Sequence, residues 1–154
     1  MNKRRLLKLA DLLEADAKNK TGIKFDLGLI ARKAPTADRP YHEDFSPREP
    51  IPVDCGTAAC AVGLACISGA FAKSGLSYSI SRDNGLMPKY RRPDGKTFSQ
   101  WTSATTAFFG ITPDECQFLF TQWRYPVGKT TGAIGERYVA KRIRNFVAGK
   151  VAPQ

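Results

Sequence analysis

Residues 58–71 constrain the fold of this chain more than any other stretch, because they include no charged side chain. Apolar residues fall on every side of a helical wheel, and a helix that is hydrophobic all round is normally a central, buried one. The stretch is too short to cross a bilayer, which takes about 20 apolar residues. We therefore expect a buried central helix over residues 57–71, with Thr57 as its N-cap.

Four further segments have the pattern of helices. Residues 2–18 repeat apolar side chains at helical spacing, and residues 97–109 precede a glycine, Gly110, that can end a helix. Thr112 followed by Pro113 and Glu115 is the signature of a capping box, which predicts a helix starting there. The last helix is predicted over residues 133–148, with Gly149 as its terminator.

The remaining segments predict a little β-structure and one long connection. Apolar residues alternate with serines over residues 76–80, which predicts a short strand, and a second strand containing Pro88 would have to lie at a sheet edge. Residues 76–96 therefore form a predicted β-hairpin insert. Residues 33–52 are a proline-rich loop. We expect a mainly α fold in one domain, 1–154: a compact helical domain of about five helices around the central one.

Basic side chains gather in two places. The formal net charge is +10, which favours an anionic partner such as nucleic acid but also fits simple solubility. One cluster interleaves basic groups with an aromatic ring, a composition that can grip phosphates and stack a base. The other is a basic stripe on the last predicted helix, and either cluster is equally consistent with a solvated surface. The residues are Lys89, Tyr90, Arg91 and Arg92 in the first and Arg137, Lys141 and Arg144 in the second.

The cysteines and the single histidine give a third hypothesis. Neither the spacing of Cys60 and Cys66 nor that of the other cysteines matches a zinc site, so we expect no metal and no cofactor. Cys55 precedes the central helix, and a thiol at a helix N-terminus can be nucleophilic. The segment around Cys55 faintly resembles the nucleophile region of bacteriocin-processing cysteine peptidases. Such an enzyme needs a histidine base, and only His42 is present. Buried structural thiols are the competing interpretation.

The order of motifs along the chain resembles a loose group of small, uncharacterised bacterial and phage proteins. These share a core motif, Cys-Gly-Thr-x-x-Cys-x-x-Gly, which matches residues 55–63 here. The resemblance implies a compact helical domain in a cytoplasmic or phage setting, and it assigns no catalytic residues. Acidic residues soon after the basic N-terminus interrupt any signal-like apolar run, and no membrane-spanning stretch is seen, which also predicts a cytoplasmic protein.

Three functions follow as hypotheses. The first is a non-enzymatic interaction or accessory protein that acts through its surface on a protein partner. The second is a nucleic-acid-binding accessory protein that uses the basic last helix. The third is a cysteine-dependent enzyme with Cys55 and His42. We expect a protein without enzymatic activity and without membrane association.

Overall fold

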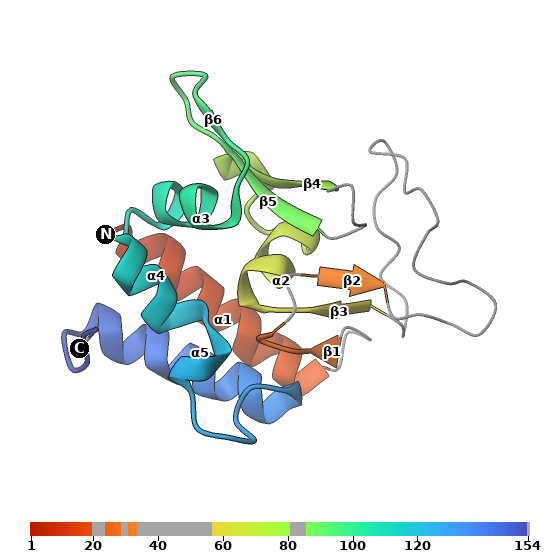
Figure 1. Ribbon diagram of the computed structural model, residues 1–154, viewed down its shortest axis with the longest axis vertical. Helices are drawn as coiled ribbons and strands as arrows, with labels where there is room; N and C mark the ends of the chain where they lie inside the picture. Colours follow the sequence, from red (N-terminus) through yellow and green to blue (C-terminus); the bar gives the residue numbers. More distant parts are fainter. Residues whose placement is uncertain (20–23, 29–30, 34–56, 81–85, 154) are drawn as a thin grey trace.

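A computed structural model describes residues 1–19, 24–28, 31–33, 57–80 and 86–153. Within these residues the protein is mainly α, as predicted, with five α-helices and two small sheets (Figure 1). None of the helices in this part of the chain has the length and apolar character that a membrane crossing requires. The helices are α1 (Lys3–Asn19), α2 (Ala61–Ile67), α3 (Trp101–Phe109), α4 (Pro113–Phe120) and α5 (Gly132–Val147).

Four of these helices begin and end close to where the sequence predicts. The Asn2 side chain caps α1 by accepting a hydrogen bond from the backbone N–H of Arg5 at 3.1 Å. The predicted capping box of α4 is confirmed: Thr112 Oγ1 accepts from the Glu115 N–H at 3.2 Å, and Glu115 Oε2 accepts from the Thr112 N–H at 2.8 Å. Gly110 ends α3 with a φ of 62°, a left-handed conformation that favours glycine.

The helix predicted over residues 57–71 is shorter than expected, and Thr57 is not its N-cap. Thr57 lies in strand β3 (Thr57–Ala59), and α2 begins only after Cys60, whose Sγ accepts a hydrogen bond from the Gly63 N–H at 3.4 Å. The helix ends at Ile67, and a 3₁₀ turn, η1 (Ala72–Ser74), follows. The prediction failed because strand pairing with distant segments occupies the residues before Cys60. All α2 side chains from Ala61 to Cys66 are buried.

The sequence did not predict the first of the two sheets, which β1 (Lys24–Phe25), β2 (Ala31–Lys33) and β3 form. β1 pairs parallel with β3, and β2 pairs antiparallel with it, giving the order β1-β3-β2. Apolar residues alternate with other residues over 23–29, a pattern typical of a strand, and β1 lies within that stretch. The proline-rich residues 34–56, like residues 81–85, lie outside the described residues.

The second sheet has the order β4-β5-β6, with every neighbour antiparallel. Its strands are β4 (Leu76–Ile80), β5 (Leu86–Arg91) and β6 (Thr97–Phe98). The expectation that Pro88 confines its strand to an edge is wrong, because β5 is the central strand. Pro88 is tolerated because β6 pairs only with Tyr90 and Arg91, so among the described strands Pro88 has a neighbour on one side only.

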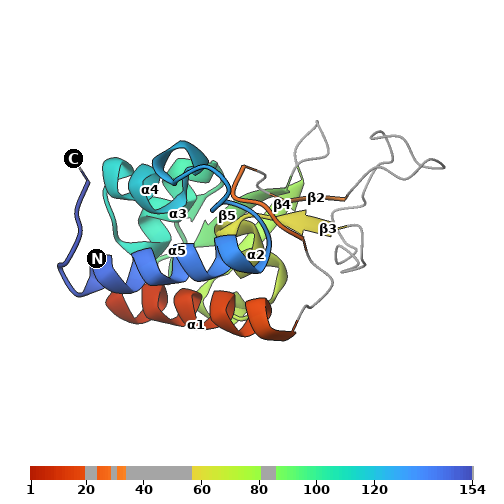
Figure 2. The same ribbon diagram turned by 90° about the horizontal axis from the view of Figure 1, so that it is seen from below.

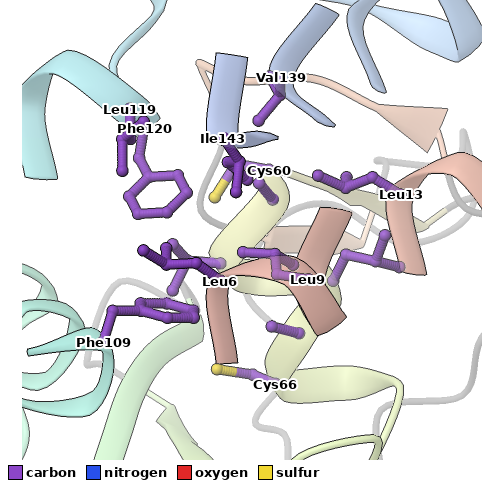
Figure 3. Close-up of a cluster of buried hydrophobic side chains, with 14 of the residues drawn as sticks. Leu6, Leu9, Leu13, Cys60, Cys66, Phe109, Leu119, Phe120, Val139 and Ile143 are labelled. Carbon is purple, nitrogen blue, oxygen red and sulfur yellow. The ribbon is translucent and has the colours of Figure 1, made fainter. Parts of the chain in front are cut away.

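The core is formed where α1, α2, α4 and α5 meet (Figure 3). α1 and α5 lie side by side and run in opposite directions (Figure 2). Close packing of α5 on β1 depends on Gly135, because a Cβ atom there would stand 3.0 Å from the Phe25 ring. The core side chains that come from these elements include Leu6, Leu9 and Leu13 of α1, Leu119 and Phe120 of α4, and Val139 and Ile143 of α5.

Candidate anion-binding groove

The basic cluster predicted at Lys89–Arg92 does not form the expected binding site. Lys89 and Arg91 are exposed on β5, but the Tyr90 side chain is only 4% exposed and packs edge-on against Phe108, with ring centroids 5.2 Å apart. Tyr90 is therefore a core residue and has no free face for a base. Arg92 is exposed and forms an ion pair with Asp94 at 3.0 Å.

The basic stripe predicted on α5 is also divided. Arg144 donates from Nε and Nη2 to the two carboxylate oxygens of Glu14, both at 2.9 Å, and from Nη2 to Asp11 at 2.6 Å. Its hydrogen bonds hold the pKa of Glu14 below its ordinary value. Arg144 thus joins α5 to α1, and its charge is compensated. Arg137 and Lys141 are exposed. In Figure 1 α5 lies in the lower part of the molecule and β5 in the upper part, so the two clusters lie apart.

Lys141 instead lines a groove of about 720 Å³ that sequence analysis did not predict. The groove lies between the outer face of α5, the end of α4, the 3₁₀ turn η2 (Gln122–Arg124) and the chain that follows α5. Of the described residues that form its walls, four are basic and none is acidic. None of the four pairs with a carboxylate in the described part of the chain. They are Arg124, Lys141, Arg142 and Lys150.

Arg142 is held rigidly in the wall of this groove. Its guanidinium carbon lies 3.6 Å from the centroid of the Tyr125 ring and 4.9 Å from that of Phe118. Its Nη1 donates to the Phe118 carbonyl at 3.0 Å. Tyr125 is itself fixed, because it is buried and its hydroxyl donates to the Leu119 carbonyl at 2.6 Å. A guanidinium group fixed in this way loses little entropy when it binds an anion.

The wall beyond α5 depends on how the helix ends. Gly149 has a φ of 70°, and the Lys150 N–H donates to the Asn145 carbonyl at 2.8 Å, so the chain turns sharply at this point. The residues after the turn line the groove, and Val151 packs against the hydrophobic core. Lys150 thereby lies on the same groove as Lys141 and Arg142, although it is not part of the helix.

An aromatic ring adds a second kind of contact. Tyr138 lines the groove and is half exposed, and the ammonium group of Lys129 lies 5.3 Å from its ring centroid. The groove therefore combines cations with an accessible ring. This composition suits a ligand that is anionic and has flat or apolar parts.

The cysteine hypothesis is not tested by the structure, because Cys55 and His42 lie outside the described residues. The other three cysteines are buried, and burial raises the pKa of each thiol, to about 12 for Cys116. These thiols are core side chains. Among the residues that are described, no group of three or more potential ligands could hold a metal ion.

Sequence patterns missed most of the groove because its members come from separate elements. Arg124, Arg142 and Lys150 belong to η2, α5 and the turn after α5, and they come together only when these segments pack against one another. The one available signal was on α5 itself, since Tyr138, Lys141, Arg142 and Asn145 recur at helical spacing on one face. No protein-family model matches the chain, and no curated protein or solved structure matches it significantly.

Proposed function

We propose that this protein is a non-enzymatic accessory protein that binds single-stranded nucleic acid in the groove beside α5. The observation that carries the proposal is the set of four cations around one open groove without a carboxylate. Phosphates supply most of the affinity in such complexes. Tyr138 offers a ring for sequence-tolerant stacking. A cytoplasmic setting, where such a ligand occurs, belongs to the same proposal.

The groove favours a single strand over a duplex. Stacking on Tyr138 requires an unpaired base, and bases within a duplex are stacked on one another. The cations line a concave surface formed by α5, η2 and the last turn, which suits a flexible backbone. We therefore expect oligothymidylate to bind more tightly than a duplex of the same length.

Charge reversal within the groove tests the proposal. The double variant Lys141→Glu/Lys150→Glu should lower the affinity for a labelled oligothymidylate of about 12 nucleotides at least tenfold in a fluorescence anisotropy titration. The matched control is Lys89→Glu/Arg91→Glu, which changes the net charge equally but on exposed side chains of β5. Equal losses in the two variants would show that net charge, and not the groove, governs binding.

A protein partner is a second candidate function, favoured by a different observation. Trp123 and Val127 are strongly exposed apolar side chains, and Ile134 is about half exposed. Exposed groups of this kind often mark protein interfaces. If a partner binds there, Val127→Asp should abolish its retention from nuclease-treated host lysate while leaving nucleic-acid affinity intact. Retention that is unchanged in the variant would exclude Val127 from such an interface. The phage origin suggested by the resemblance is part of this second proposal.

A further inference from the structure

A second, smaller pocket of about 180 Å³ also lies beside η2. Its lining is mostly apolar and aromatic, with Leu27 of the segment after β1, Phe120 of α4 and Trp101 of α3. Trp123 of η2 completes it. Two consecutive residues of η2 therefore line different sites: Trp123 lines the pocket, and Arg124 lines the groove.

One residue that lines the pocket, Trp101, carries a buried hydrogen-bond donor. The indole Nε1 of Trp101 is closed to solvent and has no hydrogen-bond partner among the described residues. An unsatisfied buried donor costs about 1–3 kcal/mol. A ligand that brings a carbonyl oxygen to this atom would remove that cost. The Gln122 side chain also lines the pocket and lies against Gly28. Because Nε1 is closed to solvent, a side chain around it has to move before a ligand can reach it.

Trp123 supplies a stacking surface at the edge of the same pocket. Its side chain is 76% exposed, which is unusual for an indole in a folded protein. Stacking of a base on an aromatic side chain contributes about 1–3 kcal/mol. Because Arg124 follows directly on the groove side, a base on Trp123 and a phosphate in the groove can belong to one strand.

We propose that this pocket receives one unpaired nucleobase of the bound strand, stacked on Trp123, with a ring carbonyl accepting a hydrogen bond from Trp101 Nε1. The inference rests on the proposed function and adds a base-recognition site to it. Thymine, uracil, cytosine and guanine carry such a carbonyl, and adenine does not. The pocket therefore favours carbonyl-bearing bases.

Intrinsic fluorescence gives a direct readout, because the chain has only two tryptophans and both line this pocket. Oligothymidylate should quench the emission, and an abasic oligonucleotide with the same number of phosphates should not. The abasic ligand should also bind at least about tenfold more weakly, because it lacks the bases that stack on Trp123 and on Tyr138. Trp123→Ala, at an exposed position, should reduce this difference in affinity to the part that stacking on Tyr138 contributes.

Trp101→Phe separates the hydrogen bond from stacking. This variant should lower the preference for oligothymidylate over oligoadenylate relative to the wild type, while quenching of Trp123 persists. The Trp123→Ala and abasic comparisons remain informative if Trp101→Phe does not fold. An affinity difference between the two oligonucleotides that Trp123→Ala leaves unchanged, without quenching in the wild type, would overturn the base pocket and leave the groove intact. Absence of binding to both ligands at low salt would instead overturn the proposed function itself.

Discussion

Arg142 and Tyr125 form the tightest cation–π pair in the described part of the chain, with the guanidinium carbon 3.6 Å from the ring centroid. The pair connects the core to the groove, because Tyr125 is buried and Arg142 lines the groove wall. We therefore expect the stability of the fold and the binding of a ligand in the groove both to depend on Arg142. This relationship gives the first prediction.

Arg142→Lys should weaken both stability and binding, although it keeps the positive charge. A lysine cannot reproduce the planar stacking on Tyr125 together with the hydrogen bond to the Phe118 carbonyl. We expect a loss of about 1 kcal/mol in the free energy of unfolding, measured by urea denaturation. Arg137→Lys is the matched control on the exposed side of α5 and should change little. A fully stable Arg142→Lys variant would contradict the role given to this pair.

Arg144 should matter for stability and not for nucleic-acid binding. Its side chain is 39% exposed and is bonded to Asp11 and Glu14 across the α1–α5 interface, so Arg144→Ala should cost about 1 kcal/mol or less. Lys141→Ala should show the reverse pattern, with lower affinity and nearly unchanged stability. Urea denaturation of both variants measures their stability, and anisotropy titration measures their affinity for the oligonucleotide. A large loss of affinity in Arg144→Ala would show that the ion pairs open in the complex.

The same ion pair predicts a contribution to acid sensitivity. The pKa of Glu14 is lowered in the folded state, chiefly by its hydrogen bonds to Arg144. The stabilisation is therefore present above the ordinary glutamate pKa of about 4.5 and is lost as the pH falls through the lowered folded value. Glu14→Gln should reduce the loss of stability on acidification, as followed by urea denaturation across that pH range.

Glu136 should have the opposite effect to Glu14 on the pH dependence of stability. Its side chain is 3% exposed, and burial, followed by a hydrogen bond to Asp16, raises its pKa to about 8. The folded state thus binds more protons than the unfolded state between about pH 4.5 and 8, so this group lowers stability as the pH rises through that range. Glu136→Gln should raise the free energy of unfolding at pH 8 by on the order of 2 kcal/mol relative to wild type. The exposed Asp94→Asn variant is the control and should keep the wild-type trend.

Thiol labelling tests the cysteine hypothesis without assuming an activity. Cys60, Cys66 and Cys116 are buried with raised pKa values, so they should react with iodoacetamide only after denaturation. Mass spectrometry of the folded protein should therefore find at most one fast-reacting thiol, Cys55. Rapid labelling of Cys55 at neutral pH would favour the enzyme hypothesis, and slow labelling would exclude an activated thiolate.

Local sequence signals were sufficient to predict four helices. They were not sufficient to predict where α2, at the centre of the molecule, begins. The caps at Asn2 and Thr112 are encoded within one turn of chain, and the structure confirms both. The start of α2 was misplaced because Thr57 pairs with Lys33 and its neighbour Ala58 pairs with Lys24, contacts that no local pattern reports. The long apolar stretch was interpreted as one helix for that reason.

Only part of the candidate groove could be predicted from the sequence. Lys141 was identified from the charge pattern of its helix, but its neighbours Arg124 and Lys150 belong to other elements. Tyr90 was misinterpreted because an aromatic residue between basic ones has the same sequence signature whether it is exposed or buried beneath Phe108. Arg144 was misinterpreted because its acidic partners lie on α1, more than 100 residues away in the chain.

The most direct test is the salt dependence of oligothymidylate binding. Each phosphate contact to a single strand contributes about −0.7 to the slope of log K against log salt, so the four groove cations predict a slope of about −3. Neutralising Lys141 and Lys150 together should make the slope shallower by about 1.4. A slope that the double variant leaves unchanged, or no binding at about 50 mM salt, would contradict the assignment of the groove as a nucleic-acid site.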